Sequence, residues 1–282
     1  MRKFKSPNAL FNDLRYCIDY ILKFFIKKES KSQSPFSYFD RERLESAPRY
    51  TKMEIRFFDT PFYVSDPMTF LSGYKEIFKK EPYLFEFDES KPWIIDCGAN
   101  VGLSVVYFKM KYPSAKIIAV EPDPELFKLL KKNIESFGWH DVIILQKAVW
   151  FEDGIIKFRQ EGGFSGQIIK GEHFGELIEI DAISLDNLID NLEIGLLKID
   201  VEGAENEVFI HSSPNFKNVS NIFIEYHSRK NEQQNLQRIL SSLSEQGFRY
   251  HIHHEFVNQS PFVSRFDLVG MDLQLSVFGY KK

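Results

Sequence analysis

The stretch WIIDCGANVG, which runs from Trp93 to Gly102, constrains the possible folds more than any other part of the chain. Four residues suited to a β-strand run directly into a loop with two glycines, Gly98 and Gly102, and a helical pattern follows as far as Lys111. Glycine allows backbone to come close to a ligand, and the helix N-terminus after such a loop commonly holds that ligand. The stretch therefore predicts a strand–loop–helix unit that binds a cofactor.

Strand-like and helix-like segments alternate from Trp93 to about residue 246. The clearest helix runs from Asp123, a suitable N-cap, through Pro124 to Gly138, a suitable C-terminal stop. Alternation of this kind predicts a parallel, doubly wound α/β sheet. The last two strand patterns, 249–256 and 273–280, have no helix between them, which predicts an antiparallel strand at the C-terminal edge. Residues 150–182, around EGGFSG, are expected to form a hairpin excursion that either covers the substrate or is only a hairpin tip.

The N-terminal part has a different pattern. Apolar residues recur at three- and four-residue steps over 9–28, which predicts an amphipathic helix, and a polar stretch with a proline follows. We expect three parts: 1–48, the amphipathic helix and linker; 49–92, an extension of the catalytic domain with a hairpin over 51–64 and a helix over 67–80; and 93–282, the cofactor-binding domain.

Charge and cysteine content limit the class of protein. The net charge of −4 argues against a nucleic-acid binder. Residues 1–31, however, carry eight Lys or Arg against three acids, so the predicted helix either packs on its own domain or a partner subunit, or lies on an anionic membrane face. A disulfide between the two cysteines, Cys17 and Cys97, is not expected, and we find no signal peptide or transmembrane span. These features predict a cytoplasmic protein, either free or peripheral at the inner face of the membrane.

The glycine spacing separates two classes of cofactor. Nicotinamide-binding folds use Gly-x-Gly-x-x-Gly after the first strand, whereas this loop reads Asp96-x-Gly98-x-x-x-Gly102. A carboxylate at Asp96 would repel a pyrophosphate but suits the amino group and sulfonium of S-adenosylmethionine. Glu121, at the end of the second strand, can accept the ribose hydroxyls of either cofactor. The loop therefore favours S-adenosylmethionine.

Three motifs, IDCGANVG, AVEPDPELFKLLKKN and LLKIDVEGAE, together resemble the FkbM-type methyltransferases, which use S-adenosylmethionine. The resemblance runs from about Phe62 to the end of the chain. It implies a Rossmann-like, mostly parallel, doubly wound sheet with an antiparallel C-terminal strand, to which this chain adds an N-terminal helical appendage. It also implies the cofactor-binding residues: Asp96, Gly98, Ala99, Asn100 and Gly102 at the methionine end, Glu121 at the ribose, and Lys147 and Ala148 at the adenine.

The third motif carries the candidate catalytic residues. The two-residue period of a strand places Lys198, Asp200 and Glu202 on one face, and the neighbouring strand brings Glu225 and His227. Three interpretations remain open. Asp200, with Glu202 or His227, is a general base for a hydroxyl; Asp200 and Glu225 hold a divalent cation; or the charges form an internal salt-bridge network in which Lys198 neutralises Asp200 and Glu202 or Glu205 serves the following helix.

The resemblance implies O-methylation of a hydroxyl on a sugar, glycan or secondary-metabolite precursor, so a small-molecule or glycan acceptor is the expected partner; the net charge predicts no nucleic-acid partner. Two alternatives from other classes are a nicotinamide-dependent oxidoreductase and a catalytically silent binding module on the same fold. The sequence makes no prediction about the oligomeric state.

Overall fold

The computed structural model describes residues 35–160, 167–168, 176–255, 260, 262–263 and 270–281. The predicted amphipathic helix over 9–28, and with it the membrane or subunit contact of residues 1–31, lies outside the described residues. So does the EGGFSG segment over 161–166.

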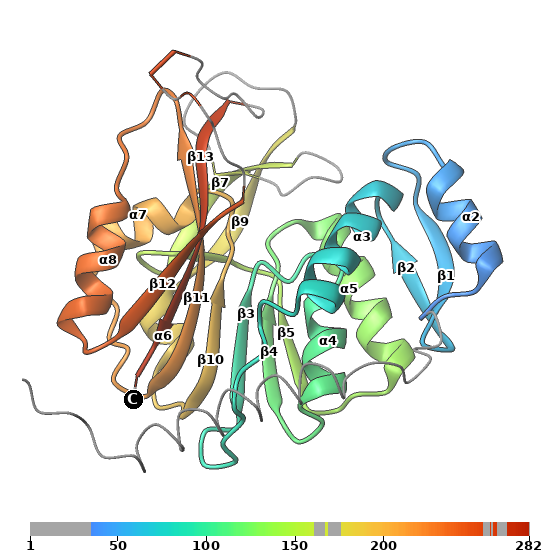
Figure 1. Ribbon diagram of the computed structural model, residues 1–282, viewed down its shortest axis with the longest axis horizontal. Coiled ribbons are helices and arrows are strands. Elements are labelled where there is room, and N and C mark those ends of the chain that lie inside the picture. Colours follow the sequence, from blue (N-terminus) through green and yellow to red (C-terminus); the bar gives the residue numbers. More distant parts are fainter. Residues whose placement is uncertain are drawn as a thin grey trace, which may run out of the picture.

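The central sheet is built from two groups of strands (Figure 1). In the first group β3 (Trp93–Cys97), β4 (Lys116–Val120) and β5 (Val142–Leu145) pair in parallel. In the second group β10 (Ile194–Ile199) and β11 (Val219–Arg229) are parallel, and β13 (Met271–Tyr280) lies antiparallel between β11 and β12 (Arg249–His254).

Hydrogen bonds at both ends join the two groups along β3 and β10. The N–H of Trp93 donates to the carbonyl of Glu193 at 3.3 Å, and the N–H of Asp200 donates to the carbonyl of Cys97 at 3.1 Å. The strand order is therefore β5-β4-β3-β10-β11-β13-β12. The carboxyl ends of β3 and β10 consequently lie side by side, which is where ligands bind in open α/β sheets.

Helices cover both faces of this sheet (Figure 1). On one face α4 (Leu103–Lys111) and α5 (Pro124–Phe137) pack on the apolar side chains of β3, β4 and the facing side of β10. On the other face α6 (Leu185–Ile189), α7 (Ala204–His211) and α8 (Leu236–Glu245) pack on a larger apolar core. The predicted Rossmann-like, doubly wound sheet and its antiparallel C-terminal strand are confirmed.

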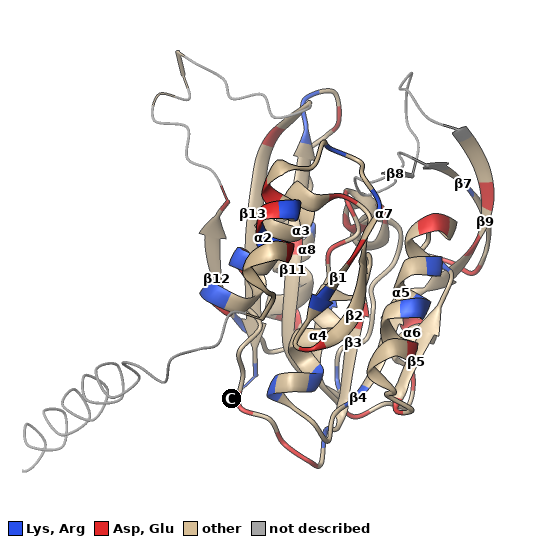
Figure 2. Cartoon of the chain, turned by 90° about the vertical axis from the view of Figure 1, so that its right-hand side faces the viewer, with Lys and Arg blue, Asp and Glu red and all other residues tan. Residues whose placement is uncertain are grey.

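Helix α5 begins and ends as its sequence predicts. The side chain of Asp123 accepts the N–H groups of Glu125 and Leu126, Pro124 occupies the first turn, and Gly138 ends the helix with a φ of 68°. Its outer face carries charges of both signs (Figure 2). A helix with one apolar and one charged face packs with its apolar face on the sheet and its charged face toward solvent. Asp123, its N-cap, directly follows Glu121 and Pro122, so the cap also fixes the loop at the end of β4.

The N-terminal extension packs against α4 and α5. It consists of α2 (Tyr38–Ser46), the antiparallel hairpin of β1 (Met53–Phe57) and β2 (Thr60–Val64), α3 (Pro67–Tyr74) and a π-helical segment η1 (Lys75–Lys80). An aromatic cluster holds it together: Phe36, Phe57, Phe62, Phe70 and Tyr74. The same core includes Val101 and Leu103, so the extension is anchored beside the glycine loop.

A second, smaller sheet follows β5. Its strands are β6 (Ala148–Trp150), β7 (Gly154–Gln160), β8 (Gln167–Ile168) and β9 (Glu176–Ser184), in the order β6-β9-β7-β8. β7 pairs antiparallel with both β8 and β9, which is the expected hairpin excursion. In the described part of the chain, every helix is too short or too polar to cross a bilayer.

Candidate active site

The glycine loop between β3 and α4 is packed directly on the end of β10. Gly98 has a φ of 85°, and a Cβ atom there would lie 1.8 Å from the carbonyl oxygen of Asp200. Gly102 has a φ of 90°, and a Cβ atom there would lie 2.8 Å from Leu130 of α5. Both positions combine a left-handed backbone with a close approach, so both need glycine. The loop is thereby held between the strand that carries Asp200 and the helix that follows β4.

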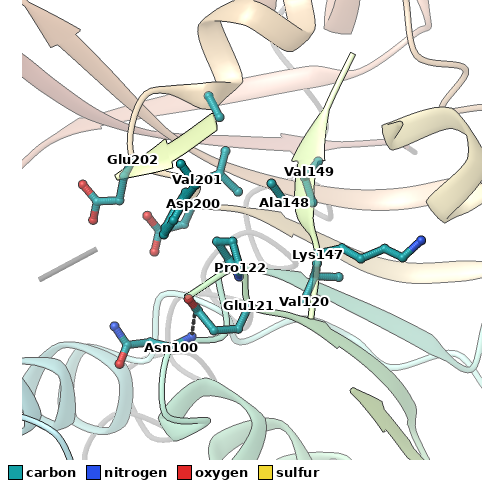
Figure 3. Close-up of a pocket in the computed structure, with 13 residues that line it drawn as sticks. Asn100, Val120, Glu121, Pro122, Lys147, Ala148, Val149, Asp200, Val201 and Glu202 are labelled. Atoms are coloured by element: carbon teal, nitrogen blue, oxygen red, sulfur yellow. Dashed lines mark hydrogen bonds between the residues drawn. The ribbon is translucent and has the colours of Figure 1, made fainter. Parts of the chain in front are cut away.

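Glu121 ties the loop to the end of β4. One carboxylate oxygen accepts the N–H of Asn100 at 2.8 Å (Figure 3), and the other accepts the N–H of Asp123 at 2.9 Å. Burial raises the pKa of Glu121 to about 8, against the lowering effect of the two N–H donors. The predicted ribose-binding residue is therefore a buried carboxyl group at the lip of a pocket.

That pocket contains most of the residues predicted to bind cofactor (Figure 3). It is lined by Gly98, Asn100, Val120, Glu121, Pro122, Lys147, Ala148, Val149, Phe158, Asp200, Val201, Glu202 and Ala204. In Figure 3 the carboxyl groups of Asp200 and Glu202 point the same way, toward the side on which Asn100 lies. The sequence-based interpretation missed Phe158 of β7, because the small sheet carries no motif that relates it to the glycine loop.

A second pocket lies on the other side of the loop, against the N-terminal extension. Its walls combine extension residues with the loop and β10: Val64, Ser65, Asp66, Thr69, Phe70, Gly73, Ile77, Tyr83, Gly98, Ala99, Asn100, Val101, Leu103, Ser104, Lys198 and Asp200. Asp200, Gly98 and Asn100 line both pockets. The site thus has two compartments that meet at the end of β10. Gly102 lines neither of them and acts through the loop's shape.

Asp96 lies beneath the loop and lines neither pocket. It is fully buried, the hydroxyl of Ser104 donates to its Oδ2 at 2.5 Å, and the ammonium of Lys198 lies 3.0 Å from its Oδ1. Its carboxylate therefore contacts Ser104 and Lys198, and its contact with the methionine end of a cofactor stays a prediction.

Lys198 connects the loop to the catalytic candidates. Its ammonium donates to the carbonyl of Gly98 at 3.1 Å and lies 3.3 Å from Asp200 Oδ2, in addition to its contact with Asp96. Burial alone would lower the pKa of Lys198, but Asp96 and Asp200 outweigh it and raise the pKa well above its usual value. Lys198 is therefore a fixed positive charge beneath the site.

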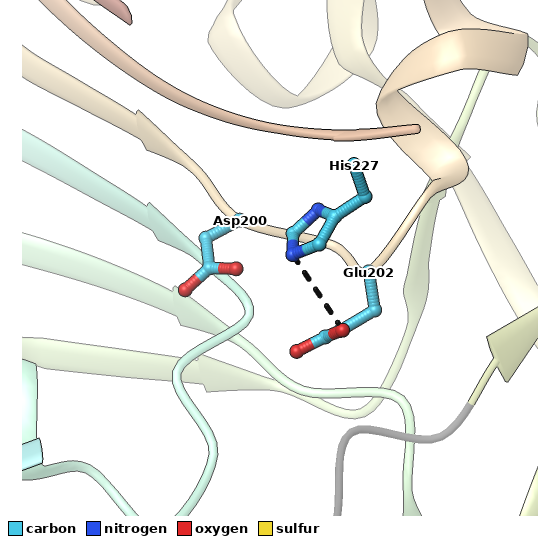
Figure 4. A group of neighbouring side chains, drawn as sticks. All are labelled: Asp200, Glu202 and His227. Carbon is cyan, nitrogen blue, oxygen red and sulfur yellow. Dashed lines mark ion pairs between the residues drawn. The ribbon is translucent and has the colours of Figure 1, made fainter. Parts of the chain in front are cut away.

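Asp200, Glu202 and His227 form a cluster at the carboxyl ends of β10 and β11 (Figure 4). One ligand atom from each lies within 4.8 Å of the other two. His227 is almost completely buried, whereas the side chains of Asp200 and Glu202 are 23% and 27% exposed. The three residues predicted from the third motif and the adjacent strand are thus brought together.

Glu205 fixes the imidazole of His227 from behind. Its Oε1 lies 3.1 Å from Nδ1 of His227 and accepts the main-chain N–H of His227 at 2.8 Å, while its Oε2 accepts the N–H of Gly203 at 2.8 Å. Glu205 thus serves the start of α7, as expected, and also orients the histidine. Burial alone would lower the pKa of His227, but Glu205 and Glu202 outweigh it and raise the pKa well above its usual value.

Glu225 stands at the edge of the cluster. Its Oε1 lies 3.9 Å from Nε2 of His227, and the amide of Gln274 on β13 donates to the same oxygen. Burial, reinforced by the charge of Asp200, raises the pKa of Glu225 well above its usual value. The side chain is 14% exposed and lines neither pocket.

A doubly wound sheet with a glycine loop, an acid at the end of the second strand and a ligand pocket across both defines a Rossmann-like cofactor-binding protein. The family model of the methyltransferase FkbM domain matches residues 96–250. The chain therefore belongs to the FkbM methyltransferase family.

Three relatives of known name illustrate the range of this similarity. The chain is 33% identical over 171 residues to methyltransferase sdnD of Sordaria araneosa, covering 48% of this chain and 66% of the relative. It is 26% identical over 170 residues to 31-O-demethyl-FK506 methyltransferase FkbM of Streptomyces tacrolimicus, covering 48% and 65%. It is 28% identical over 148 residues to hexuronic acid methyltransferase AglP of Haloferax volcanii, covering 51% and 60%. The match spans between 60% and 66% of the length of these relatives, less than two thirds of each.

Proposed function

We propose that the chain is an S-adenosylmethionine-dependent methyltransferase that methylates a hydroxyl group. The observation that carries this proposal is the pocket that joins Glu121, the Gly98–Asn100 loop and Asp200. Glu121 would accept the ribose hydroxyls, Lys147 and Ala148 would border the adenine, and the loop would hold the methionine end. The reactive methyl group would then lie near Asp200, where the two pockets meet.

The transfer needs one attacking oxygen and one proton acceptor. The hydroxyl oxygen attacks the methyl carbon while the carbon–sulfur bond breaks, which leaves S-adenosylhomocysteine as the neutral sulfide. The hydroxyl proton passes to Asp200, whose carboxylate is partly exposed and lines both pockets. Lys198 keeps that carboxylate oriented, and the protein supplies positioning and proton removal.

The acceptor class that we propose is a hydroxyl on a sugar, glycan or secondary-metabolite precursor. The names of two relatives support it, since one is described by an O-methyl position and the other by a hexuronic acid. A nicotinamide-dependent oxidoreductase is disfavoured by Asp96 and by the spacing Gly98-x-x-x-Gly102, which does not fit the dinucleotide pattern.

The positive charge of residues 1–31 supports a separate proposal about location, namely reversible contact with an anionic membrane. Flotation with anionic liposomes tests it. Salt-sensitive flotation of the full chain, but not of a chain lacking residues 1–31, is the expected result, and equal behaviour of the two contradicts it.

Calorimetric titration of the full chain with S-adenosylmethionine and, separately, with NADH tests the proposed function. We expect binding of the sulfonium cofactor alone, with a stoichiometry of about one per chain. Binding of NADH without binding of S-adenosylmethionine would replace the methyltransferase with the oxidoreductase. A chain that binds S-adenosylmethionine yet transfers no methyl group to any of a panel of hydroxyl acceptors would support the silent binding module.

A further inference from the structure

We propose that Asp200, Glu202 and His227 form a binding site for a divalent metal cation, which receives the acceptor hydroxyl. The inference rests on the proposed function of the same site and adds a cofactor to it. The ligand set differs from the pair Asp200 and Glu225 that the sequence suggests, because the structure places Glu225 at the edge of the cluster and Glu202 inside it.

The buried imidazole is oriented as a metal ligand. Glu205 accepts from the main chain of both His227 and Gly203, so its carboxylate is fixed, and it faces Nδ1 of His227 at 3.1 Å. In the neutral imidazole a carboxylate in this position directs the proton to Nδ1 and leaves the lone pair on Nε2, so a metal ion there would take the place of the second proton. The Nε2 atom faces the cluster (Figure 4).

The spacing around Nε2 suits a cation better than a hydrogen bond. The carboxylate oxygens that face Nε2 lie at 3.6 Å on Glu202 and 3.9 Å on Glu225, which is beyond hydrogen-bond distance. Two ligands at roughly 2.1 Å from one metal ion are roughly 3.0 Å apart at an octahedral angle and roughly 3.4 Å apart at a tetrahedral angle. The 3.6 Å between Nε2 and the Glu202 oxygen is within a few tenths of an ångström of the tetrahedral separation, so a small side-chain shift would place both atoms on one ion.

The charges around the cluster of Asp200, Glu202 and His227 also favour binding of a cation. Asp200 and Glu202 bring two carboxylates to the cluster and Glu205 adds a third behind it, whereas burial raises the pKa of Glu225 and favours its neutral form. Lys198, on the far side of Asp200, is already shared with Asp96. One nitrogen and two oxygen ligands suit a first-row divalent cation such as Mn²⁺, and they leave coordination positions for an acceptor hydroxyl.

The cation would supply acidity to the acceptor. A bound hydroxyl would have a lowered pKa, and the oxygen of Asp200 that does not hold the cation would take its proton. The competing interpretation is a metal-free ion-pair network in which a protonated His227 lies between Glu205 and Glu202. The two interpretations differ in whether the full chain binds a metal ion at all.

Titration of Mn²⁺ into the chelator-treated and dialysed full chain tests the site, with the signal of free Mn²⁺ followed by electron paramagnetic resonance. We expect about one bound Mn²⁺ per chain. Glu202→Gln should weaken binding by at least tenfold, and this partly exposed side chain can be changed without opening the core. Asp200→Asn should do the same. Glu152→Gln removes an equal charge from an exposed position outside both pockets, so it should bind Mn²⁺ as the wild type does.

Wild-type chain that binds no Mn²⁺, or a folded Glu202→Gln variant that binds it as tightly as the wild type, would overturn the inference. Calorimetry with S-adenosylmethionine on the same samples separates this failure from that of the proposed function. A chain that binds S-adenosylmethionine but no Mn²⁺ loses only the metal site. A chain whose Mn²⁺ binding depends on Glu202, but which does not bind S-adenosylmethionine, keeps the metal site and loses the proposed function.

Discussion

The ammonium of Lys198 lies 3.0 Å from the carboxylate of Asp96, and both side chains are almost completely buried. This ion pair lies beneath the glycine loop, because Lys198 also donates to the carbonyl of Gly98. The two residues thus link β3, β10 and the loop between β3 and α4. A buried pair of this kind is costly to break, since removal of one partner leaves the other charge without compensation.

We therefore expect Lys198→Ala to lower the free energy of unfolding by about 3–5 kcal/mol, the range for a broken buried ion pair. Urea denaturation measures the change. Lys128→Ala is the control, because Lys128 pairs with Glu125 on the exposed face of α5 and should lose no more than about 1 kcal/mol. A loss at Lys198 as small as that of the control would show that Asp96 is stabilised by other groups.

Glu121 should make cofactor binding depend on pH. Its buried carboxyl has a pKa raised to about 8, so in the empty pocket its ionised fraction grows between pH 7 and 9. Because the ionised form accepts ribose hydroxyls better and attracts a cationic cofactor, affinity for S-adenosylmethionine should rise over that range. Glu121→Gln should weaken binding by about 1.5–3 kcal/mol at pH 9, or roughly tenfold to a hundredfold, and should remove this part of the pH dependence.

Calorimetry at several pH values compares the two proteins, and the difference between them cancels the titration of the cofactor itself. The raised pKa of Glu121 affects stability in the opposite direction: the free energy of unfolding should fall as pH rises. Since folding disfavours the ionised carboxyl, the wild type should lose stability relative to Glu121→Gln as pH rises from about 4.5 to about 8. Equal pH profiles for the two proteins would show that Glu121 does not titrate in this range.

The order of strands and helices follows from the sequence because its signals are local. Alternating patterns predict the doubly wound sheet, and Asp123, Pro124 and Gly138 mark the limits of α5. The pocket around Glu121, Lys147 and Ala148 also follows, since the ends of adjacent parallel strands must meet at one edge.

Local sequence signals do not predict which of these side chains are buried beneath the loop and which reach the pockets. The two-residue period correctly places Lys198 and Asp200 on one face, but it gives no indication that Lys198 reaches under the loop to Asp96. The period also fails for Glu202, because β10 ends at Ile199 and Glu202 has a left-handed φ of 55°. A turn, not the pleat of a strand, brings Glu202 to His227.

The pocket-lining residues that come from distant parts of the chain could not be predicted from the sequence either. Phe158 enters the first pocket from the small sheet, and Ser65 and Thr69 enter the second from the N-terminal extension. These contacts depend on how separate units pack together. The spacing of residues within a motif carries no information about that packing.

Asp200→Asn should separate catalysis from cofactor binding. The substitution keeps the shape of the side chain but removes the proton acceptor, so turnover should fall by roughly 100-fold or more. Affinity for S-adenosylmethionine should stay within a few fold, because Glu121 and the glycine loop remain in place. Methyl transfer to an acceptor on which the wild type is active, together with calorimetry, measures both quantities.

Asp190→Asn is the matched control, since Asp190 is exposed and lines neither pocket. It should leave turnover and cofactor affinity unchanged. If Asp200→Asn unfolds the protein, or leaves turnover intact in a folded enzyme, Asp200 belongs to the salt-bridge network with Lys198 and another group accepts the proton.

Gly98→Ala should disrupt both the fold and the cofactor pocket. Its new Cβ atom would lie 1.8 Å from the carbonyl oxygen of Asp200, so the loop and β10 would have to move apart. We expect the free energy of unfolding to fall by about 2–5 kcal/mol, of which about 1–2 kcal/mol comes from the left-handed backbone and about 1–3 kcal/mol from overpacking.

Gly138→Ala provides the comparison, because Gly138 has a similar φ of 68° but no atom of the described residues lies within 4 Å of its added Cβ. The Gly138→Ala variant should lose only the part of the free energy of unfolding that comes from the left-handed backbone, and it should keep its affinity for S-adenosylmethionine. Urea denaturation and calorimetry on both variants measure the difference, and equal losses in stability and affinity would show that the close approach of Gly98 to Asp200 is not what the loop requires.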